Sequence, residues 1–249
     1  MIHSAVKEIR KEKGGIFTIE FDADMKASPG QFLMIWVPGL REIPMSLSRT
    51  EKPFSITFRV FGDSTRALSE LRRGDYLFFR GPYGNSYPVP SGRIAYVAGG
   101  TGMASLKSMI DRYPGDVYVG AKNRDELFFV ESGYYIATDD GSSGYRGTVV
   151  DLFFSEGKEY DYIFVCGPEQ MMKSLYDRLP KNTSAKVFMS LERLMKCGIG
   201  ICDSCSINGF RVCKDGTVFD LGQISTMTEF GISRRGASGK LEFLTNPKR

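Results

Sequence analysis

The sequence predicts a multidomain protein of the β plus α/β class, and three observations lead to that prediction. Short strand-like segments fill the first 90 residues. From about residue 93 onward, apolar strand-like runs alternate with helical patterns. Four of the five cysteines then gather near the C-terminus. We therefore expect an N-terminal β-barrel, a doubly wound parallel-sheet domain and a small C-terminal subdomain built around the cysteines.

The N-terminal part is predicted to be a barrel or sandwich of short strands. Its strand-like segments are rich in β-branched and aromatic residues, and Gly, Pro and Asp separate them. These segments are residues 15–22, 30–37, 53–61 and 75–81. One short helix is expected at residues 67–72, before the turn at Gly74.

The middle of the chain shows the alternation of a doubly wound sheet. Residues 93–100 form a continuous apolar run that ends in glycines, as a buried parallel strand would. The following elements are expected to be a helix at 103–113, strands at 117–122, 134–140 and 162–167, and helices beginning near 148 and 167. A further short helix is expected at 190–196, leading into the cysteines.

Composition and charge exclude several classes of function. The chain has 249 residues, of which 42% are hydrophobic and 25% charged, as in an ordinary globular protein. The net charge of +4 is scattered, so no nucleic-acid footprint is expected. No signal peptide and no membrane span are expected, which favours a cytoplasmic location. The only histidine is His3, and this scarcity argues against catalysis by a Ser-His-Asp or Cys-His arrangement.

The most specific signal is the spacing of four cysteines, with four, two and seven residues between successive members. This matches the loop of plant-type ferredoxins and predicts a 2Fe–2S cluster, in which each iron takes two thiolates. Glycines between the first two cysteines would let the backbone bend and turn N–H groups toward the sulfur atoms. A zinc site or a disulfide remains an alternative. The predicted ligands are Cys197, Cys202, Cys205 and Cys213.

A glycine-rich turn predicts a nicotinamide nucleotide site. The turn follows a buried strand and opens a helix, whose free N–H groups suit a pyrophosphate, although a simple tight turn would look the same. Its residues are Gly99, Gly100, Thr101 and Gly102. Cys166 ends a second apolar strand and would either face the ligand crevice or be an inert buried thiol.

If both sites exist, a flavin is expected between them. A nicotinamide gives up two electrons together as a hydride, whereas a 2Fe–2S cluster accepts one at a time. A flavin can hold one or two extra electrons and can therefore split the pair.

At this point the sequence resembles the electron-transfer subunits of the NAD-linked, two-subunit dihydroorotate dehydrogenases, a flavin/2Fe–2S family related to ferredoxin reductases. The resemblance covers nearly the whole chain. The shared segments include PMSL at 44–47, RVFGDST at 59–65, GGTG at 99–102, CGPEQMM at 166–172 and SLERLMKCGIGICDSC at 190–205. It implies a flavin-binding barrel over 1–91, an NAD(P)-binding domain over 92–189 and a cluster-binding subdomain with the tail over 190–249.

The resemblance also implies roles for individual residues. FAD would bind the barrel, NAD(H) would bind the glycine turn, and Ser46 and Cys166 would lie at the reacting centre. The flavin contacts that it implies are Ile43, Pro44, Met45, Ser46, Leu47, Phe58, Arg59, Val60, Ser64 and Thr65. Relatives usually have an arginine at the position of Ile43, where it pairs with the FAD phosphates. Arg41, Arg49 or Arg59 could replace it, and the choice between FAD and FMN stays open.

The implied activity is that of an NAD(P)H-linked oxidoreductase subunit in pyrimidine biosynthesis. Its partner would be an FMN-containing dihydroorotate dehydrogenase catalytic subunit, in a heterotetramer of two copies of each. No residue of this chain suggests a base for dihydroorotate chemistry, so no dihydroorotate oxidation is expected from it alone. Two alternatives remain: the same module with another partner (a sulfide dehydrogenase, transhydrogenase or hydrogenase), or a non-enzymatic binding module stabilised by zinc.

Overall fold

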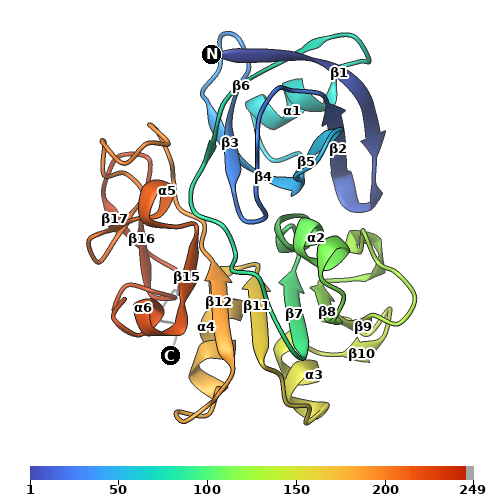
Figure 1. Cartoon of the computed structure of the whole chain (residues 1–249), viewed down its shortest axis with the longest axis vertical. Coiled ribbons are helices and arrows are strands. Elements are labelled where there is room, and N and C mark those ends of the chain that lie inside the picture. The colour runs from blue at the N-terminus through green and yellow to red at the C-terminus, as the bar shows by residue number, and fades with distance from the viewer. Residues whose placement is uncertain (245–249) are drawn as a thin grey trace.

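The computed structural model describes residues 1–244 and divides into three regions (Figure 1). A barrel lies at the top of the view, and a sheet flanked by helices lies below it. The region that carries the cysteines lies beside the sheet and reaches up along one side of the barrel. The predicted fold class is confirmed.

The barrel is closed by six antiparallel strands in the order β1-β2-β5-β4-β3-β6. Its core consists of apolar side chains that alternate along the strands, such as Ile19, Leu33 and Phe79, all of them buried. Its elements are β1 (Ile2–Lys11), β2 (Ile16–Phe21), β3 (Phe32–Trp36), β4 (Ile43–Arg49), β5 (Phe54–Arg59), α1 (Asp63–Ser69) and β6 (Tyr76–Tyr83), with a 3₁₀ turn at Lys13–Gly15.

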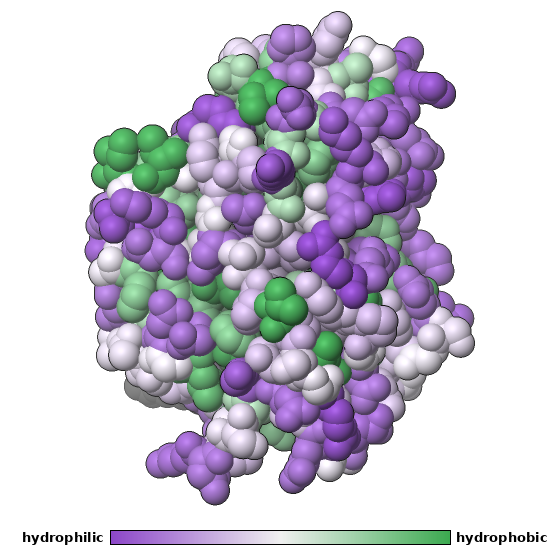
Figure 2. All heavy atoms as spheres, in the orientation of Figure 1, coloured by the Kyte–Doolittle hydropathy of each residue, from purple (hydrophilic) through white to green (hydrophobic). Residues whose placement is uncertain are grey.

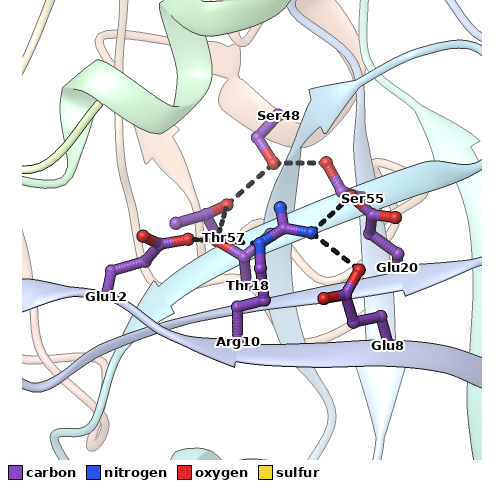
Figure 3. A network of polar contacts seen from close by, with 8 residues as sticks. All are labelled: Glu8, Arg10, Glu12, Thr18, Glu20, Ser48, Ser55 and Thr57. Carbon is purple, nitrogen blue, oxygen red and sulfur yellow. Dashed lines mark hydrogen bonds and ion pairs between the residues drawn. The ribbon is translucent and has the colours of Figure 1, made fainter. Parts of the chain in front are cut away.

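The opposite face of β4 and β5 carries a chain of hydroxyls (Figure 3). Ser48 Oγ lies 2.8 Å from Ser55 Oγ and 2.9 Å from Thr57 Oγ1. Thr57 in turn lies 3.0 Å from Thr18, which donates to Glu12 at 3.0 Å. These hydroxyls are buried, and helix α2 packs on β4 at this face. Because each hydroxyl has a partner, the polar face can be covered without leaving unpaired groups.

The sheet has seven strands in the order β10-β9-β8-β7-β11-β12-β15, and only β15 is antiparallel to its neighbour. The order in which the chain adds strands reverses between β7 and β11, which is where ligands bind in folds of this kind. The elements are β7 (Ile94–Gly99), α2 (Gly102–Arg112), β8 (Asp116–Ala121), β9 (Tyr135–Thr138), β10 (Tyr145–Arg146), α3 (Val149–Ser155), β11 (Tyr162–Cys166), α4 (Glu169–Arg178), β12 (Lys186–Ser190) and β15 (Val218–Asp220), with a 3₁₀ turn at Arg124–Glu126.

The cysteine-rich region is an excursion between the neighbouring strands β12 and β15. Three short elements belong to it, and three more follow the return to the sheet. They are β13 (Ser206–Ile207), β14 (Phe210–Arg211), α5 (Val212–Asp215), α6 (Leu221–Ser225), β16 (Ser233–Arg235) and β17 (Leu241–Phe243).

Two local predictions differ from the structure. The helix expected at 190–196 is wrong, because residues 191–196 follow β12 without helical structure. Buried and exposed side chains alternate along this segment with a period of two, as in an extended chain. The helix expected at 67–72 begins earlier, at Asp63, and ends at Ser69.

The domain boundaries stay predictions, although the sheet continues past residue 190 to include β15. No helix within residues 1–244 is both long and apolar enough to cross a membrane.

Candidate functional site

A cavity of about 470 Å³ lies where the barrel meets the carboxyl edge of the sheet. Its wall combines residues from β4 and β5, from the start of α2, and from the segment that leaves β12. The lining residues are Phe32, Pro44, Met45, Ser46, Thr57, Phe58, Arg59, Phe61, Thr65, Thr101, Ala104, Ser105, Ser190, Leu191, Glu192, Arg193, Met195 and Thr217. Three regions of the chain therefore share one site.

The structure places some of the predicted cofactor residues on this cavity and others away from it. Seven line it, namely Pro44, Met45, Ser46, Phe58, Arg59, Thr65 and Thr101. Leu47 is fully buried in the barrel core, and Ile43 and Val60 pack against that core. The cavity is thus reached by the middle of the 43–47 motif, while the residues at its two ends pack on the barrel core.

The hydroxyls expected to hold a pyrophosphate are already engaged within the chain. Thr65 Oγ1 accepts from the N–H groups of Phe61 and Gly62 at 2.8 and 3.0 Å, which caps the start of α1. Ser64 Oγ donates to the Arg41 carbonyl at 3.2 Å and does not line the cavity. The Phe61 side chain is 95% exposed at the cavity edge, although its backbone is fixed by Thr65.

One predicted arginine is paired rather than free. Arg59 on β5 reaches across to the sheet domain and pairs with Glu126, with 3.2 Å between Nη2 and Oε2. This contact ties the barrel to the 3₁₀ turn after β8. The guanidinium still lines the cavity, so it can contribute positive charge there.

The glycine turn lies at the carboxyl end of β7, as predicted. Its backbone approaches the end of β11 so closely that a Cβ at Gly102 would lie 2.2 Å from the Cys166 carbonyl oxygen. Gly100 adopts a φ of +51°, and a Cβ at this position would meet no atom within 4 Å. Glycine is thus required at 102 for packing and at 100 for conformation.

Cys166 lies at the centre of the sheet edge but does not open onto the cavity. Its side chain is 1% exposed, and Sγ lies 3.8 Å from the Ser190 carbonyl oxygen. Burial, and secondarily the charge of Glu192, raise the pKa of the Cys166 thiol to about 12. The thiol is therefore neutral at physiological pH.

Sequence reasoning missed the cavity residues that follow β12. Arg193 is almost fully buried, and its Nη2 donates to Glu169 Oε1 at 2.8 Å, within a paired contact to that carboxylate. Its Nε, by contrast, has no partner among the described residues. Glu192 and Ser190 line the same wall. No sequence signal could have found them, because 190–196 does not alternate apolar and polar residues: the charged Arg193 is buried and the apolar Leu194 is exposed.

The four predicted cluster cysteines come together as two pairs. Cys213 N donates to Cys205 Sγ at 3.4 Å, and both residues are buried. Cys197 and the exposed Cys202 form the second pair, at the outer side. Each iron of a 2Fe–2S cluster binds two protein thiolates, so two pairs of cysteines suit a cluster of two irons.

Backbone N–H groups point at these sulfur atoms, as the loop glycines predict. Gly200 N lies 3.1 Å from Cys213 Sγ, and Ile201 N lies 3.4 Å from Cys197 Sγ. Burial opposes ionisation of Cys197, but N–H groups led by that of Cys202 lower its pKa to about 6. Burial and the neighbouring Cys205 raise the pKa of Cys213 to about 12. A bound cation would relieve this crowding of thiols, so the donor set fits a thiolate-bound metal group.

The cysteine loop is fastened to the barrel. Arg80 on β6 donates to the Cys197 carbonyl at 3.1 Å and pairs with Glu42 at 2.5 Å. Arg211 donates to the Gly200 carbonyl at 3.3 Å from the other side. The loop is thus held between the barrel and its own hairpin.

The arrangement of barrel, sheet and cysteine loop defines a protein of the ferredoxin-reductase-like class. A solved NADH-dependent reduced ferredoxin-NADP oxidoreductase superposes with a TM-score of 0.78 at 24% identity, over 89% of each chain. Phthalate dioxygenase reductase, described as transferring electrons from pyridine nucleotides to [2Fe-2S], superposes with a TM-score of 0.58 at 16% identity. That match covers 88% of this chain and 75% of the other. At these identities the likeness concerns the fold.

Sequence comparison defines the family within this class. Residues 192–225 match the iron-sulfur cluster binding domain of dihydroorotate dehydrogenase B. A probable dihydroorotate dehydrogenase B (NAD(+)) electron transfer subunit of Thermoplasma volcanium is 46% identical, over 96% of this chain and 97% of that protein. The corresponding protein of Pyrococcus horikoshii is 36% identical over the same shares of both chains. The chain belongs to the family of dihydroorotate dehydrogenase B electron transfer subunits, as its sequence motifs predicted.

Proposed function

We propose that this chain moves electrons between NAD(H), FAD and a 2Fe–2S cluster, to or from an FMN-containing dihydroorotate dehydrogenase catalytic subunit. The observation that carries the proposal is the shared cavity. Residues from the barrel, from the glycine turn and from the segment leading to Cys197 line one space. A flavin held there would lie between the nucleotide site and the cysteine loop, which is the order in which the electrons must pass.

The cavity offers suitable groups for each cofactor. Pro44, Met45 and Ser46 would lie along the flavin, and the exposed ring of Phe61 would give an aromatic surface for stacking. The unpaired Nε of Arg193 offers a donor. The turn at 99–102 would take the nucleotide pyrophosphate, with N–H groups at the start of α2.

The flavin supplies the conversion between two-electron and one-electron transfer. The protein contributes positioning and exclusion of water. Ser190 lines the cavity at the end of β12, and the buried, neutral Cys166 thiol lies behind it at the end of β11. Ser46 and Cys166 remain the proposed residues of the reacting centre, Ser46 on the wall and Cys166 beneath it.

The cysteine loop would face the partner. Its outer pair, Cys197 and Cys202, is the more exposed, and Ile199 and Ile201 stand out beside it with 44% and 77% of their surfaces exposed. Figure 2 shows apolar side chains gathered at the upper left, where Figure 1 draws the orange part of the chain. We further propose a cytoplasmic location, a heterotetramer of two copies of each subunit, and no dihydroorotate oxidation by this chain alone.

The decisive experiment is an anaerobic visible spectrum of the purified chain with iron and sulfide assays, before and after NADH. Flavin and cluster bands that bleach together on NADH addition are the expected result. In Cys202→Ser the cluster bands should vanish while the flavin still bleaches, whereas Cys166→Ser, which removes the one cysteine outside the predicted ligand set, should keep both sets of absorption bands. A protein with zinc and no sulfide would refute the proposal and support the binding module instead.

A second experiment tests the identity of the partner subunit. Mixing the flavin-loaded chain with its proposed catalytic subunit should give a complex in which dihydroorotate reduces NAD⁺. Dihydroorotate turnover by the chain alone would contradict the proposed division of labour. Co-purification with a sulfide dehydrogenase or hydrogenase subunit would assign the same module to another enzyme.

A further inference from the structure

A line of hydroxyls leads from the cavity wall to a carboxylate at the barrel surface (Figure 3). Thr57 on β5 lines the cavity, and its Oγ1 lies 3.0 Å from that of Thr18, the residue directly opposite on β2. Thr18 in turn donates to Glu12 Oε1 at 3.0 Å. Both threonines are buried, whereas 22% of the Glu12 side chain is exposed. The line therefore joins the cavity wall to a carboxylate that water can reach.

The carboxylate fixes the direction in which the hydroxyl protons point. An ionised carboxylate only accepts hydrogen bonds, and a hydroxyl has one proton to donate and two lone pairs. Thr18 gives its proton to Glu12, so Thr57 must be the donor in the contact between Thr57 and Thr18. By the same reasoning Ser48 donates to Thr57 at 2.9 Å, and Ser55 donates to Ser48 at 2.8 Å. Among the described residues, these bonds use the Thr57 proton and leave its oxygen one lone pair.

We infer that Thr57, Thr18 and Glu12 form a proton relay between a flavin in the cavity and water. This rests on the proposed function, because it needs a flavin there. A flavin that receives two electrons one at a time must also take up one proton before it can pass a hydride to NAD⁺, and it must release one in the opposite direction.

The relay moves one proton by forming and breaking one O–H bond at each hydroxyl. In the outward direction a proton binds the lone pair of Thr57, the original Thr57 proton moves to Thr18, and the original Thr18 proton moves to Glu12. The Glu12 carboxyl group then gives its proton to water. The hydroxyls rotate back about their single bonds, and the inward direction runs the same steps in reverse.

The surroundings of Glu12 suit a group that gains and loses a proton. The one cation beside it within the described residues is Arg10, whose Nε lies 3.8 Å from Glu12 Oε1. Arg10 Nη1 also pairs with Glu20 at 2.9 Å and with Glu8 at 3.0 Å. One guanidinium therefore serves three carboxylates, and Glu12 has the most distant of the three contacts.

The test follows one oxidation of the flavin-loaded protein by stopped flow. Anaerobically photoreduced protein is mixed with ferricyanide, a one-electron oxidant, and the flavin absorbance is recorded. A parallel run with a pH-indicator dye in weak buffer records the released proton. The flavin trace is then repeated at rising concentrations of imidazole, a small base that can enter the cavity and take the proton directly.

Four variants separate the relay from the rest of the hydroxyl network. Thr18→Val and Glu12→Gln interrupt the path and should slow proton release and flavin oxidation at least tenfold, and imidazole should restore the oxidation rate. Thr18→Ser keeps the hydroxyl and should behave like the wild type. Ser55→Ala, the matched control, removes a buried hydroxyl of the same network that lies off the path, and its rates should stay within twofold of the wild type.

Other results would overturn the relay and leave the proposed function intact. Unchanged rates in Thr18→Val and Glu12→Gln would show that the proton leaves through the cavity mouth. Slowing that imidazole does not reverse, or equal slowing in Ser55→Ala, would show that the hydroxyls only support the fold. If Thr18→Val does not fold, Glu12→Gln decides by the same criteria. A wild-type chain that binds no flavin would overturn both the relay and the proposed function.

A second measurement needs no flavin. In flavin-free protein with ¹³C-labelled threonine, NMR should show the Thr18 hydroxyl proton in slow exchange with water, because the residue is buried. Glu12→Gln should shift this resonance, since it removes the carboxylate that accepts the bond, and Glu8→Gln should not. A resonance that Glu12→Gln leaves in place, or a hydroxyl proton that exchanges too fast to be seen, would overturn the relay.

Discussion

The contact between the glycine turn and β11 can be tested with one methyl group. In Gly102→Ala the new Cβ would lie 2.2 Å from the Cys166 carbonyl oxygen and 2.4 Å from its carbonyl carbon. Both are backbone atoms of a central strand and cannot rotate away. The nearer contact is short by roughly 1.3 Å relative to ordinary packing at about 3.5 Å, so helix α2 must move away from the sheet.

The expected cost is at the upper end for overpacking, about 3 kcal/mol or more. At about 2–4 °C per kcal/mol for a chain of this size, the melting temperature should fall by about 6 °C or more. Gly100→Ala is the matched control, since its Cβ meets no atom within 4 Å and suffers only a positive φ of 51°, for about 1–2 kcal/mol.

The assay is thermal denaturation of the flavin-loaded protein, followed by circular dichroism for both variants and the wild type. Gly102→Ala should be clearly the less stable of the two. If both variants melt within about 2 °C of each other, the close approach of α2 to β11 does not limit this position and the reasoning fails.

Three other substitutions test separate parts of the molecule. Phe61→Ala should weaken FAD binding about fivefold, because an aromatic stacking contact contributes about 1 kcal/mol. Fluorescence titration of the flavin-free protein with FAD measures this affinity. An unchanged affinity would show that Phe61 does not contact the flavin. Glu169→Ala should destabilise the protein by about 3–5 kcal/mol in urea denaturation, because it leaves the Arg193 guanidinium buried without its partner. A loss below about 1 kcal/mol would show that water reaches Arg193 readily. Ile201→Lys, at an exposed apolar side chain beside the cysteines, should leave the visible spectrum unchanged. It should weaken binding of the catalytic subunit at least tenfold, as measured by surface plasmon resonance. Equal binding of the variant and the wild type would place the docking surface elsewhere.

The fold could be predicted because its signals are local. The apolar runs that form β7 and β11 and the glycines that end β7 show their roles within a few residues. The first strand could not be predicted because Ile2–Lys11 is mostly polar, with Val6 its one buried residue. Its place is set by pairing with β2 and β6, and that pairing cannot be seen in the segment itself.

Some residues of the candidate site could likewise be predicted from the sequence, and others could not. The cysteines could be found because the spacing of cluster ligands lies within one loop. The wall residues Glu192 and Arg193 could not, since they join the site only through a cavity that β4, β5 and α2 complete from distant parts of the chain. The motif at 43–47 predicted the right strand, but which of its residues line the cavity depends on how the sheet domain packs against that strand.

The excursion between β12 and β15 leaves and re-enters the sheet at neighbouring strands, at Ser190 and Val218. Contacts outside the cysteine loop also hold the returning strand. Asn85 bonds both the N–H and the carbonyl of Val218, at 2.9 and 2.7 Å, and Thr217 donates to the Gly30 carbonyl at 3.0 Å. The strand that covers the edge of β12 is therefore anchored to segments that flank the barrel, so we expect β12 to stay protected from pairing with other chains when the loop carries no metal group.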